Sequence, residues 1–441
     1  MSYAPIGQAE FDRLQRETFE YFVKEANPRN GLIADKTKPG APASIAAVGL
    51  ALSLYPIGVA RKFMDRADAV QRTLTTLRFF SNSVQGIEAD ATGYKGFYYH
   101  FLDMKSGRRV WECELSTIDT AFLLAGMLTA GAYFLDDTDD EHEIRALADK
   151  LYRRTDWQWA QNGGLTVCQG WKPESQFLPY RWQGYDEAMF LFLLGLGSPT
   201  FPLPTESYVA WTSTYQWRQL YGYNLLYSGS LFTHQISHLC FDLRGIRDEY
   251  MRGKDSDYFE NSRRATYVQQ RYAIDNPLGF SDYGETCWGI TASDGPGPDT
   301  IEIDGRQRRF FDYLARGVPD GPDDGTIAPW AVVASLPFAP EIVLPTLDYF
   351  INHVDLKTMD RLGFKATFNP THPDRSKNPF GWVSHWQFGL NQGPIVLMIE
   401  NYRSGLPWRL MRSCPYVTRG LQRAGFTGGW LDGHDSGTPL A

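Results

Sequence analysis

Apolar and amphipathic stretches alternate along the chain. Six stretches of helical length are apolar on nearly all sides: 44–54, 116–130, 185–196, 231–241, 326–336 and 392–402. Each follows a segment that has a polar face with helical period: 9–24, 60–80, 140–160, 206–220, 258–272 and 340–352. A helix that is apolar all round belongs in a protein interior, whereas an amphipathic helix exposes one face to water. The alternation therefore predicts six pairs of inner and outer helices.

Six such pairs predict an all-α fold, an (α/α)6 toroid or six-hairpin barrel, closed by a last helix near residues 414–424. An irregular all-α domain is the alternative. No low-complexity tract or Pro/Gly/Ser-rich linker interrupts the sequence, so residues 1–441 are expected to form one domain.

Four connections are long and dense in Gly, Pro, Trp and Tyr: 81–115, 161–184, 273–325 and 353–391. Long structured loops in a compact domain usually carry function. We expect these loops to gather at one end of the toroid and form a cleft over the N-terminal ends of the inner helices. Within the first loop, Lys105-Ser106-Gly107 lies between apolar runs and predicts a hairpin turn.

The net charge, the cysteine spacing and the lengths of the apolar runs exclude several classes of protein. The formal net charge is -8, which argues against a nucleic-acid partner because no basic surface is available for the phosphates. The five cysteines are widely spaced and lack a C-x-x-C pattern, so buried free thiols are expected. No apolar run is long enough to span a membrane, and the N-terminus lacks a signal-peptide pattern. The sequence as written predicts a cytoplasmic protein, or a periplasmic one if a signal has been removed.

Acidic residues lie at the start of two apolar helices. Asp186 and Glu187 precede the stretch 188–196, and Glu114 and Asp119 flank the start of 116–130. Glycoside hydrolysis needs such a pair, one carboxylic acid to protonate the leaving oxygen and one carboxylate to activate water or attack. The structural alternative is helix capping, because Ser116 and Asp119 have the spacing of a capping box and acidic residues favour a first helical turn. Glu112 is expected to face the same side as Glu114 in an extended segment.

Other polar and aromatic residues near these helices suit a sugar ligand, since aromatic rings stack on sugars and polar groups bond hydroxyls. His234 and His238 have i, i+4 spacing, which suits hydroxyl binding or helix packing better than zinc, because no third ligand is in view. Glu400 and Arg403 are expected to form either a buried ion pair or part of the surface that contacts the sugar. No cofactor and no metal is indicated. The candidate binding residues are Arg181, Trp182, Tyr185, His234, Trp288, Asp294, Trp382, Asn391 and Glu400.

Several long blocks resemble the bacterial glucoamylase-like domain proteins, a group that includes glycoside hydrolase family 144. They include APASIAAVGLAL, ELSTIDTAFLLAG, GYDEAMFLFLLGLGSP, LFTHQISHL, WGITASDGPGP and GPIVLMIENYRSGLPWRLM, spread over most of the chain. The resemblance implies an (α/α)6 toroid that cleaves β-1,2-glucan, either by endo cleavage or by exo release of sophorose. It also implies an inverting mechanism without an obligatory metal.

The resemblance carries Glu187 and Asp119 over as catalytic residues, with Glu114 as a third candidate. It leaves open which carboxylate is the acid. One departure stands at Asn391, where relatives are expected to carry aspartate. Two rival functions remain: another (α/α)6 sugar enzyme, such as a 2-epimerase or a lyase using His234 and His238, or a non-catalytic glucan-binding protein. The expected partner is an oligo- or polysaccharide.

Overall fold

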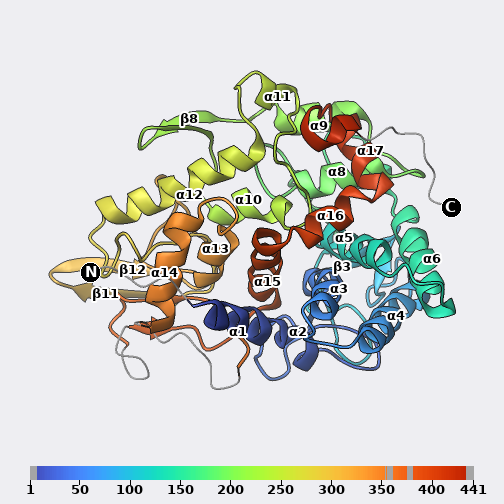
Figure 1. The fold of residues 1–441 in the computed structure, drawn as a ribbon, viewed down its shortest axis with the longest axis horizontal. Coiled ribbons are helices and arrows are strands. Elements are labelled where there is room, and N and C mark those ends of the chain that lie inside the picture. Colours follow the sequence, from blue (N-terminus) through green and yellow to red (C-terminus); the bar gives the residue numbers. More distant parts are fainter. Residues whose placement is uncertain (1–6, 353, 355–360, 375–380, 434–441) are drawn as a thin grey trace. The chain divides into compact units, whose positions relative to one another are not determined.

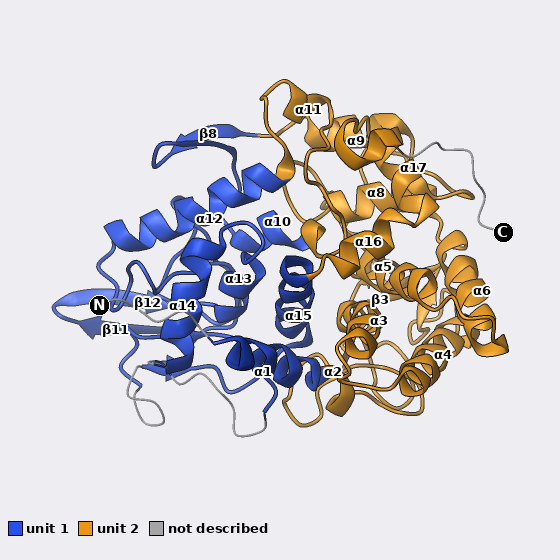
Figure 2. Ribbon diagram, in the orientation of Figure 1, with its two compact units in different colours: residues 1–21, 216–236, 259–403 blue, residues 22–215, 237–258, 404–441 orange. Residues whose placement is uncertain are grey.

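The computed structural model describes residues 7–352, 354, 361–374 and 381–433, and helices predominate in it (Figure 1). The expectations for residues 1–6 and for part of the loop 353–391 lie outside these residues. Two compact units are distinguished (Figure 2): unit 1 consists of residues 1–21, 216–236 and 259–403, and unit 2 of 22–215, 237–258 and 404–441. The single domain expected from the sequence stays a prediction.

Unit 2 contains three long apolar helices: α3 (Ile45–Ala60), α5 (Thr117–Tyr133) and α8 (Met189–Gly197). Their side chains are almost all buried, as expected for inner helices. The other helices of this unit are α2 (Tyr21–Lys24), α4 (Arg66–Asn82), α6 (Asp139–Arg153), α7 (Trp157–Ala160), α9 (Thr205–Thr212), η1 (Ile236–Leu239), α11 (Glu249–Arg252), α16 (Leu406–Arg412), α17 (Pro415–Arg423) and η2 (Gly429–Gly433).

Glycines bring α3 and α5 into backbone contact. A Cβ atom on Gly126 would lie 2.0 Å from the carbonyl oxygen of Gly49, and one on Gly49 would lie 2.3 Å from that of Phe122. Only glycine permits this approach, because any side chain at either position would overlap the neighbouring backbone. The close contact fixes α5, which carries Asp119.

Short strands cover the entrances to α3 and α5. A five-stranded antiparallel sheet has the order β2 (Gly93–Tyr94), β3 (Phe97–Tyr99), β5 (Leu115–Ser116), β6 (Gly170–Lys172) and β7 (Gln176–Phe177). A second pair joins β1 (Ala43–Ser44) to β4 (Phe101–Leu102). The strands β1 and β5 lead directly into α3 and α5, each through a serine N-cap. Thus two of the long loops predicted to be functional, 81–115 and 161–184, pair at the N-terminal end of α5.

Unit 1 contains the apolar helices α13 (Pro329–Ala334) and α15 (Gly389–Arg403), which pack against each other. The helices α1 (Gln8–Phe19) and α14 (Pro340–Asn352) pack on α15 and α13, respectively. The remaining elements are β8 (Trp217–Leu220), β9 (Tyr223–Leu226), α10 (Leu231–Gln235), α12 (Tyr258–Asp275), β10 (Ala292–Ser293), β11 (Asp299–Ile303), β12 (Arg306–Phe310), β13 (Leu314–Ala315), β14 (Phe368–Asn369) and β15 (Trp382–Val383).

All six apolar stretches contain helix, but some predicted bounds are wrong. The helix predicted for 206–220 ends at Thr212 and gives way to the β8–β9 hairpin. Tyr221 and Gly222 both have positive φ, which fits a two-residue hairpin turn and ends helical order. The stretch 231–241 changes from α10 to the 3-10 helix η1 after Gln235, so the four-residue spacing of the histidines does not place them on one α-helical face. The helix α16 was not predicted.

All five cysteines are free and buried, as expected. No helix in the described part of the chain is long and apolar enough to cross a membrane.

Candidate active site

The junction between β5 and α5 carries two of the predicted catalytic carboxylates. Glu114 directly precedes β5, and Asp119 lies in the first turn of α5. Ser116 is the N-cap: its Oγ accepts a hydrogen bond from the Asp119 amide at 3.2 Å and donates one to Asp119 Oδ2 at 2.5 Å. The capping interaction expected from the sequence is therefore present, and it also orients the Asp119 carboxylate.

His100 connects these two carboxylates. It lies between β3 and β4, and its Nδ1 is 2.8 Å from Glu114 Oε1 while its Nε2 is 3.6 Å from Asp119 Oδ2. Burial alone would lower the pKa of His100, but the charge of Asp119 and the hydrogen bond and charge of Glu114 raise it to about 9. Burial disfavours ionisation of Glu114, yet the protonated imidazole outweighs it and lowers the pKa of Glu114. The ring of His100 is thus an imidazolium at neutral pH.

Asp35 adds a fourth charged group to this cluster. Burial raises the pKa of Asp35, and the negative charge of Asp119 raises it further. The positive charges of Lys36 and His100 act in the opposite direction. Neither His100 nor Asp35 was predicted from the sequence. The available signal for His100 is a single titratable side chain within the apolar run 97–102, FYYHFL.

Glu187 precedes α8 and has a different environment. Burial raises the pKa of Glu187, and the charge of Asp119 raises it further, so the two carboxylates interact electrostatically. Within the described residues, the Glu187 carboxylate makes no hydrogen bond to another side chain. The two carboxyl groups therefore differ: Asp119 accepts a hydrogen bond from Ser116 and lies beside His100, whereas Glu187 lies in surroundings that favour its protonated form.

Asp186 anchors the segment that carries Glu187. Its Oδ1 accepts hydrogen bonds from Trp211 Nε1 at 3.0 Å and from the Ala188 amide at 2.9 Å. Burial and the neighbouring charge of Glu187 raise the pKa of Asp186 to about 8. Both acidic residues lie before α8 rather than in its first turn, so the helix-dipole alternative does not describe them. Asp186 instead holds the turn at the helix entrance.

Two predicted binding residues have structural roles in this segment. Trp182 is buried, and its Nε1 donates to Thr117 Oγ1 at 3.0 Å, which ties the segment to the first turn of α5. Arg181 donates to the carbonyl oxygens of Gln161 and Thr166, so its guanidinium closes a loop. Trp182 is only 7% exposed, so little of its ring is accessible, and its role in binding sugar stays a prediction.

Tyr185 remains half-buried beside these carboxylates. Its ring centroid lies 5.7 Å from that of Tyr215 and 6.1 Å from that of Tyr258. Glu112, expected to share a face with Glu114 in an extended segment, is exposed, and both it and Trp111 have positive φ. A left-handed turn therefore separates it from Glu114.

Several predicted binding residues belong to unit 1 and are buried there. His234 is 1% exposed, and its Nε2 lies 3.1 Å from the Ser228 carbonyl oxygen. Burial lowers the pKa of His234 to about 4. Trp288 is fully buried and donates from Nε1 to Thr346 Oγ1 at 2.9 Å. Neither ring is accessible to a ligand, because apolar packing encloses both Trp288 of the predicted loop 273–325 and His234 of the predicted inner helix 231–241.

Of the other candidate binding residues in unit 1, two are half-buried and two are buried. Asp294 and Trp382 are half-buried, and Asp294 Oδ2 accepts a hydrogen bond from Ser384 at 2.6 Å. Asn391 is buried near the start of α15. Glu400 accepts a hydrogen bond from Gln15 Nε2 at 3.0 Å, whereas Gln15 Oε1 accepts one from Arg403 Nη1 at 2.9 Å. Gln15 therefore bridges the two residues expected to form an ion pair.

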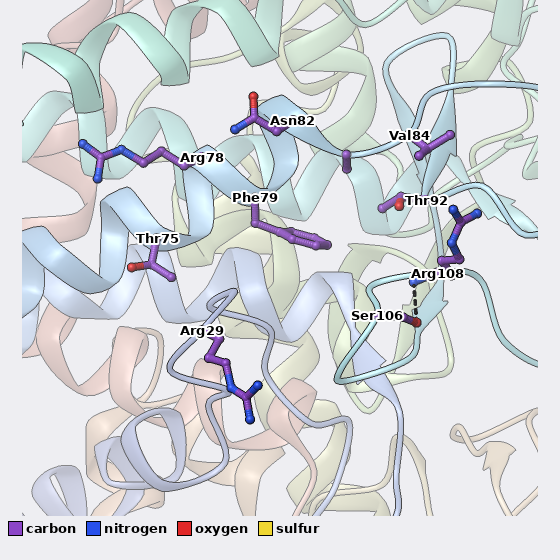
Figure 3. Close-up of a pocket in the computed structure, with 10 residues that line it drawn as sticks. Arg29, Thr75, Arg78, Phe79, Asn82, Val84, Thr92, Ser106 and Arg108 are labelled. Atoms are coloured by element: carbon purple, nitrogen blue, oxygen red, sulfur yellow. Dashed lines mark hydrogen bonds between the residues drawn. The ribbon is translucent and has the colours of Figure 1, made fainter.

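A cavity of about 490 Å³ also opens in unit 2 (Figure 3). Arg29, Arg78 and Arg108 contribute to its lining, which includes no carboxylate and none of the predicted site residues. Arg78 forms a bidentate pair with Glu143, and Arg108 pairs with Asp90. This cavity is therefore distinct from the carboxylate site. Among the described residues, no three His, Cys, Asp or Glu side chains are grouped to hold a metal.

Comparison with known proteins shows which family and which folds the chain is similar to. A family described as "Putative glucoamylase" matches residues 179–415. An exo β-1,2-glucooligosaccharide sophorohydrolase (non-reducing end) of Parabacteroides distasonis is 30% identical over 96% of this chain. The chain spans 58% of that protein's length.

Solved structures extend the similarity to the fold. A putative glucoamylase from Bacteroides uniformis is 31% identical, with a TM-score of 0.84 and coverage of 98% of this chain and 100% of the other. An endo-β-1,2-glucanase from Chitinophaga pinensis, solved with sophorotriose and glucose, is 25% identical. Its TM-score is 0.82, with coverage of 95% and 98%, respectively.

The helical architecture and the similarity to these solved structures define a helix-rich protein with a glucoamylase-like fold. The family match covers more than half of the sequence. The chain belongs to the glucoamylase-like family described by that match.

Proposed function

We propose that this protein is a glycoside hydrolase that cleaves β-1,2-glucan or β-1,2-glucooligosaccharides, by endo cleavage or by exo release of sophorose. The observation that carries the proposal is the contrast between Glu187, whose pKa is raised, and Asp119, which accepts a hydrogen bond and lies beside an imidazolium. Two carboxyl groups in opposed environments are what acid and base roles require. The family and its β-1,2-glucan-active relatives support the substrate class.

In the proposed mechanism Glu187 is the general acid. Its proton passes to the glycosidic oxygen as the bond from that oxygen to the anomeric carbon breaks. A water molecule, deprotonated by Asp119, attacks the anomeric carbon from the opposite face, which inverts the configuration. Ser116 and His100 both approach Asp119 Oδ2, so Oδ1 is the oxygen available to the water. Glu114 fixes His100 and is a positioning residue in this scheme.

The finer architecture is part of the proposal. We propose that the helices pair into an (α/α)6 toroid whose loops form a cleft, with residues 1–441 acting as a single catalytic domain. Within unit 2, the half-buried Tyr185 is proposed to contact sugar. The roles of Asp294, Trp382 and Asn391 in sugar binding stay predictions. No cofactor takes part.

Product analysis tests the function directly. The purified protein is incubated with linear β-1,2-, β-1,3- and β-1,4-glucans, and reducing ends and chain lengths are measured. We expect reducing ends from β-1,2-glucan alone, as one disaccharide if action is exo and as a ladder if it is endo. NMR of the first products reports the anomer and hence inversion.

Two outcomes would contradict the proposal. Glucan binding without any new reducing ends would indicate a non-catalytic binding protein. Interconversion of free sugars, or unsaturated products, would indicate an epimerase or a lyase. The low pKa and the burial of His234 argue against the histidine pair that an epimerase would use.

A further inference from the structure

Trp111 is the most exposed large apolar side chain among the described residues, with 68% of its surface accessible. Trp has a large apolar face and one polar N–H group, and it is enriched at binding interfaces. Its backbone φ is 58°, and that of Glu112 is 48°. Two consecutive non-glycine residues in the left-handed region are strained, and such strain persists where the surroundings impose it.

The turn that carries Trp111 is held by buried interactions. Arg109 is 8% exposed; its Nε donates to the Cys113 carbonyl oxygen at 2.7 Å, and its guanidinium pairs with Glu174. The same guanidinium lies over the ring of Tyr99, 4.6 Å from its centroid. These contacts hold the backbone of the turn before any ligand binds, which lowers the ordering cost of binding at Trp111.

A continuous series of rings leads from Trp111 to the carboxylate site. The indole centroid lies 5.3 Å from that of Phe101, and Phe101 is stacked on His100 with centroids 3.9 Å apart and planes 13° apart. His100 in turn bonds Glu114 and lies beside Asp119. The exposed indole is thus two ring contacts from the group that holds the proposed base.

We infer that Trp111 forms an additional sugar-binding subsite, on which a pyranose ring of the glucan stacks beside the sugars held at Glu187 and Asp119. This inference rests on the proposed function. The ligand is a neutral oligosaccharide, because an indole face binds the C–H face of a sugar and offers no charge. The exposed carboxylate of Glu112 is adjacent and can accept hydroxyl hydrogen bonds.

The test compares wild type, Trp111→Ala, Trp111→Phe and the control Phe201→Ala on β-1,2-glucooligosaccharides of increasing length. Phe201 is an exposed aromatic residue beyond the C-terminal end of α8, the end opposite Glu187. Loss of the indole should raise KM for long substrates about three- to tenfold with kcat preserved. The shortest cleaved substrate should be unaffected, the phenylalanine variant should be intermediate, and the control should match wild type.

Binding measurements separate this inference from the proposed function. Each protein, with and without Glu187→Gln, is titrated with the same oligosaccharides by calorimetry. Equal KM values and affinities for wild type and Trp111→Ala at every length would overturn the subsite while leaving hydrolysis intact. Trp111-dependent binding without hydrolysis would reject the proposed function and keep the subsite. Absence of both binding and hydrolysis would reject both.

Discussion

The imidazole Nδ1 of His100 lies 2.8 Å from Glu114 Oε1, and the opposite ring nitrogen faces Asp119. One cation therefore separates two carboxylates that would otherwise repel each other. The pKa of His100, raised to about 9, keeps it charged over the neutral range. The acidic site therefore contains one positive charge between two carboxylates at neutral pH.

Replacing His100 with Gln should raise the pKa of Glu114, because the imidazolium supplies the hydrogen bond and the positive charge that lower it. Glu114 then loses its negative charge at a higher pH, so the acidic limb of the kcat/KM profile should move to higher pH. The expected displacement is about one to two pH units. A pH profile from pH 4 to 9 measures it. An unchanged acidic limb with lower activity at all pH values would reduce His100 to a packing role.

Replacing Glu187 with Gln should lower kcat by a factor of about 10²–10⁴ on β-1,2-glucan, because the leaving oxygen is no longer protonated. The alkaline limb of the pH profile should disappear with the titrating group. The kcat on an aryl glycoside of sophorose should fall less, since a phenolate leaving group departs without protonation. Glu206→Gln, on the exposed first turn of α9, is the matched control. Full activity of the Glu187 variant on all these substrates would remove this residue from the mechanism.

Replacing Asp186 with Asn should stabilise the protein increasingly as pH rises. The folded-state pKa is about 8 and the ordinary value 3.8, so the native state retains a proton that the unfolded chain releases. The free energy of unfolding therefore falls from about pH 4 to about pH 8, and the variant lacks this loss. The difference should reach on the order of a few kcal/mol at pH 8 and vanish near pH 4. Thermal unfolding of both proteins across this range is the measurement. A pH-independent difference would show that Asp186 is ionised in the folded state.

Replacing Gly126 with Ala should destabilise unit 2. The new Cβ would lie 2.0 Å from the carbonyl oxygen of Gly49, and overpacking of this kind costs about 1–3 kcal/mol. Gly131 on the same helix is the control, because a Cβ there would meet only Ala148 Cβ at 3.4 Å. Gly131→Ala should be neutral or stabilising by up to about 1 kcal/mol, since alanine favours helix. Equal unfolding temperatures for the two variants would contradict the close packing of α3 and α5.

Sequence patterns located the helices well where one period dominated. The apolar stretches 44–54 and 116–130 became α3 and α5, each extended by several residues at its C-terminal end. The pattern failed at 206–220, where the Tyr221-Gly222 turn decides in favour of a hairpin. Short strands such as β5 were missed because two residues carry no detectable alternation. Their pairing depends on partners far along the chain.

The candidate site was predicted in part. The sequence predicted Glu187, Asp119 and Glu114 as catalytic residues from their positions at the starts of apolar helices. That role stays a prediction, and the structure gives the three residues electrostatically linked environments. It did not identify His100, because one histidine in an aromatic run has no pattern. Trp182 and Trp288 were expected to be platforms but are buried, whereas exposed Trp111 was not singled out. Residue type alone does not distinguish a core indole from a surface one.

The sequence by itself determined which apolar segments contain buried helices, because hydrophobic periodicity is a local property that does not depend on the arrangement of neighbouring elements. It also determined which carboxylates lie next to the N-terminal ends of the apolar helices. Only the tertiary structure decided which of them share a cation, which one is held by donors, and which lies in surroundings that favour its proton. Those properties depend on distances between β3, β5 and α8, and the electrostatic energy of a carboxylate is set by what folding places within a few ångströms of it.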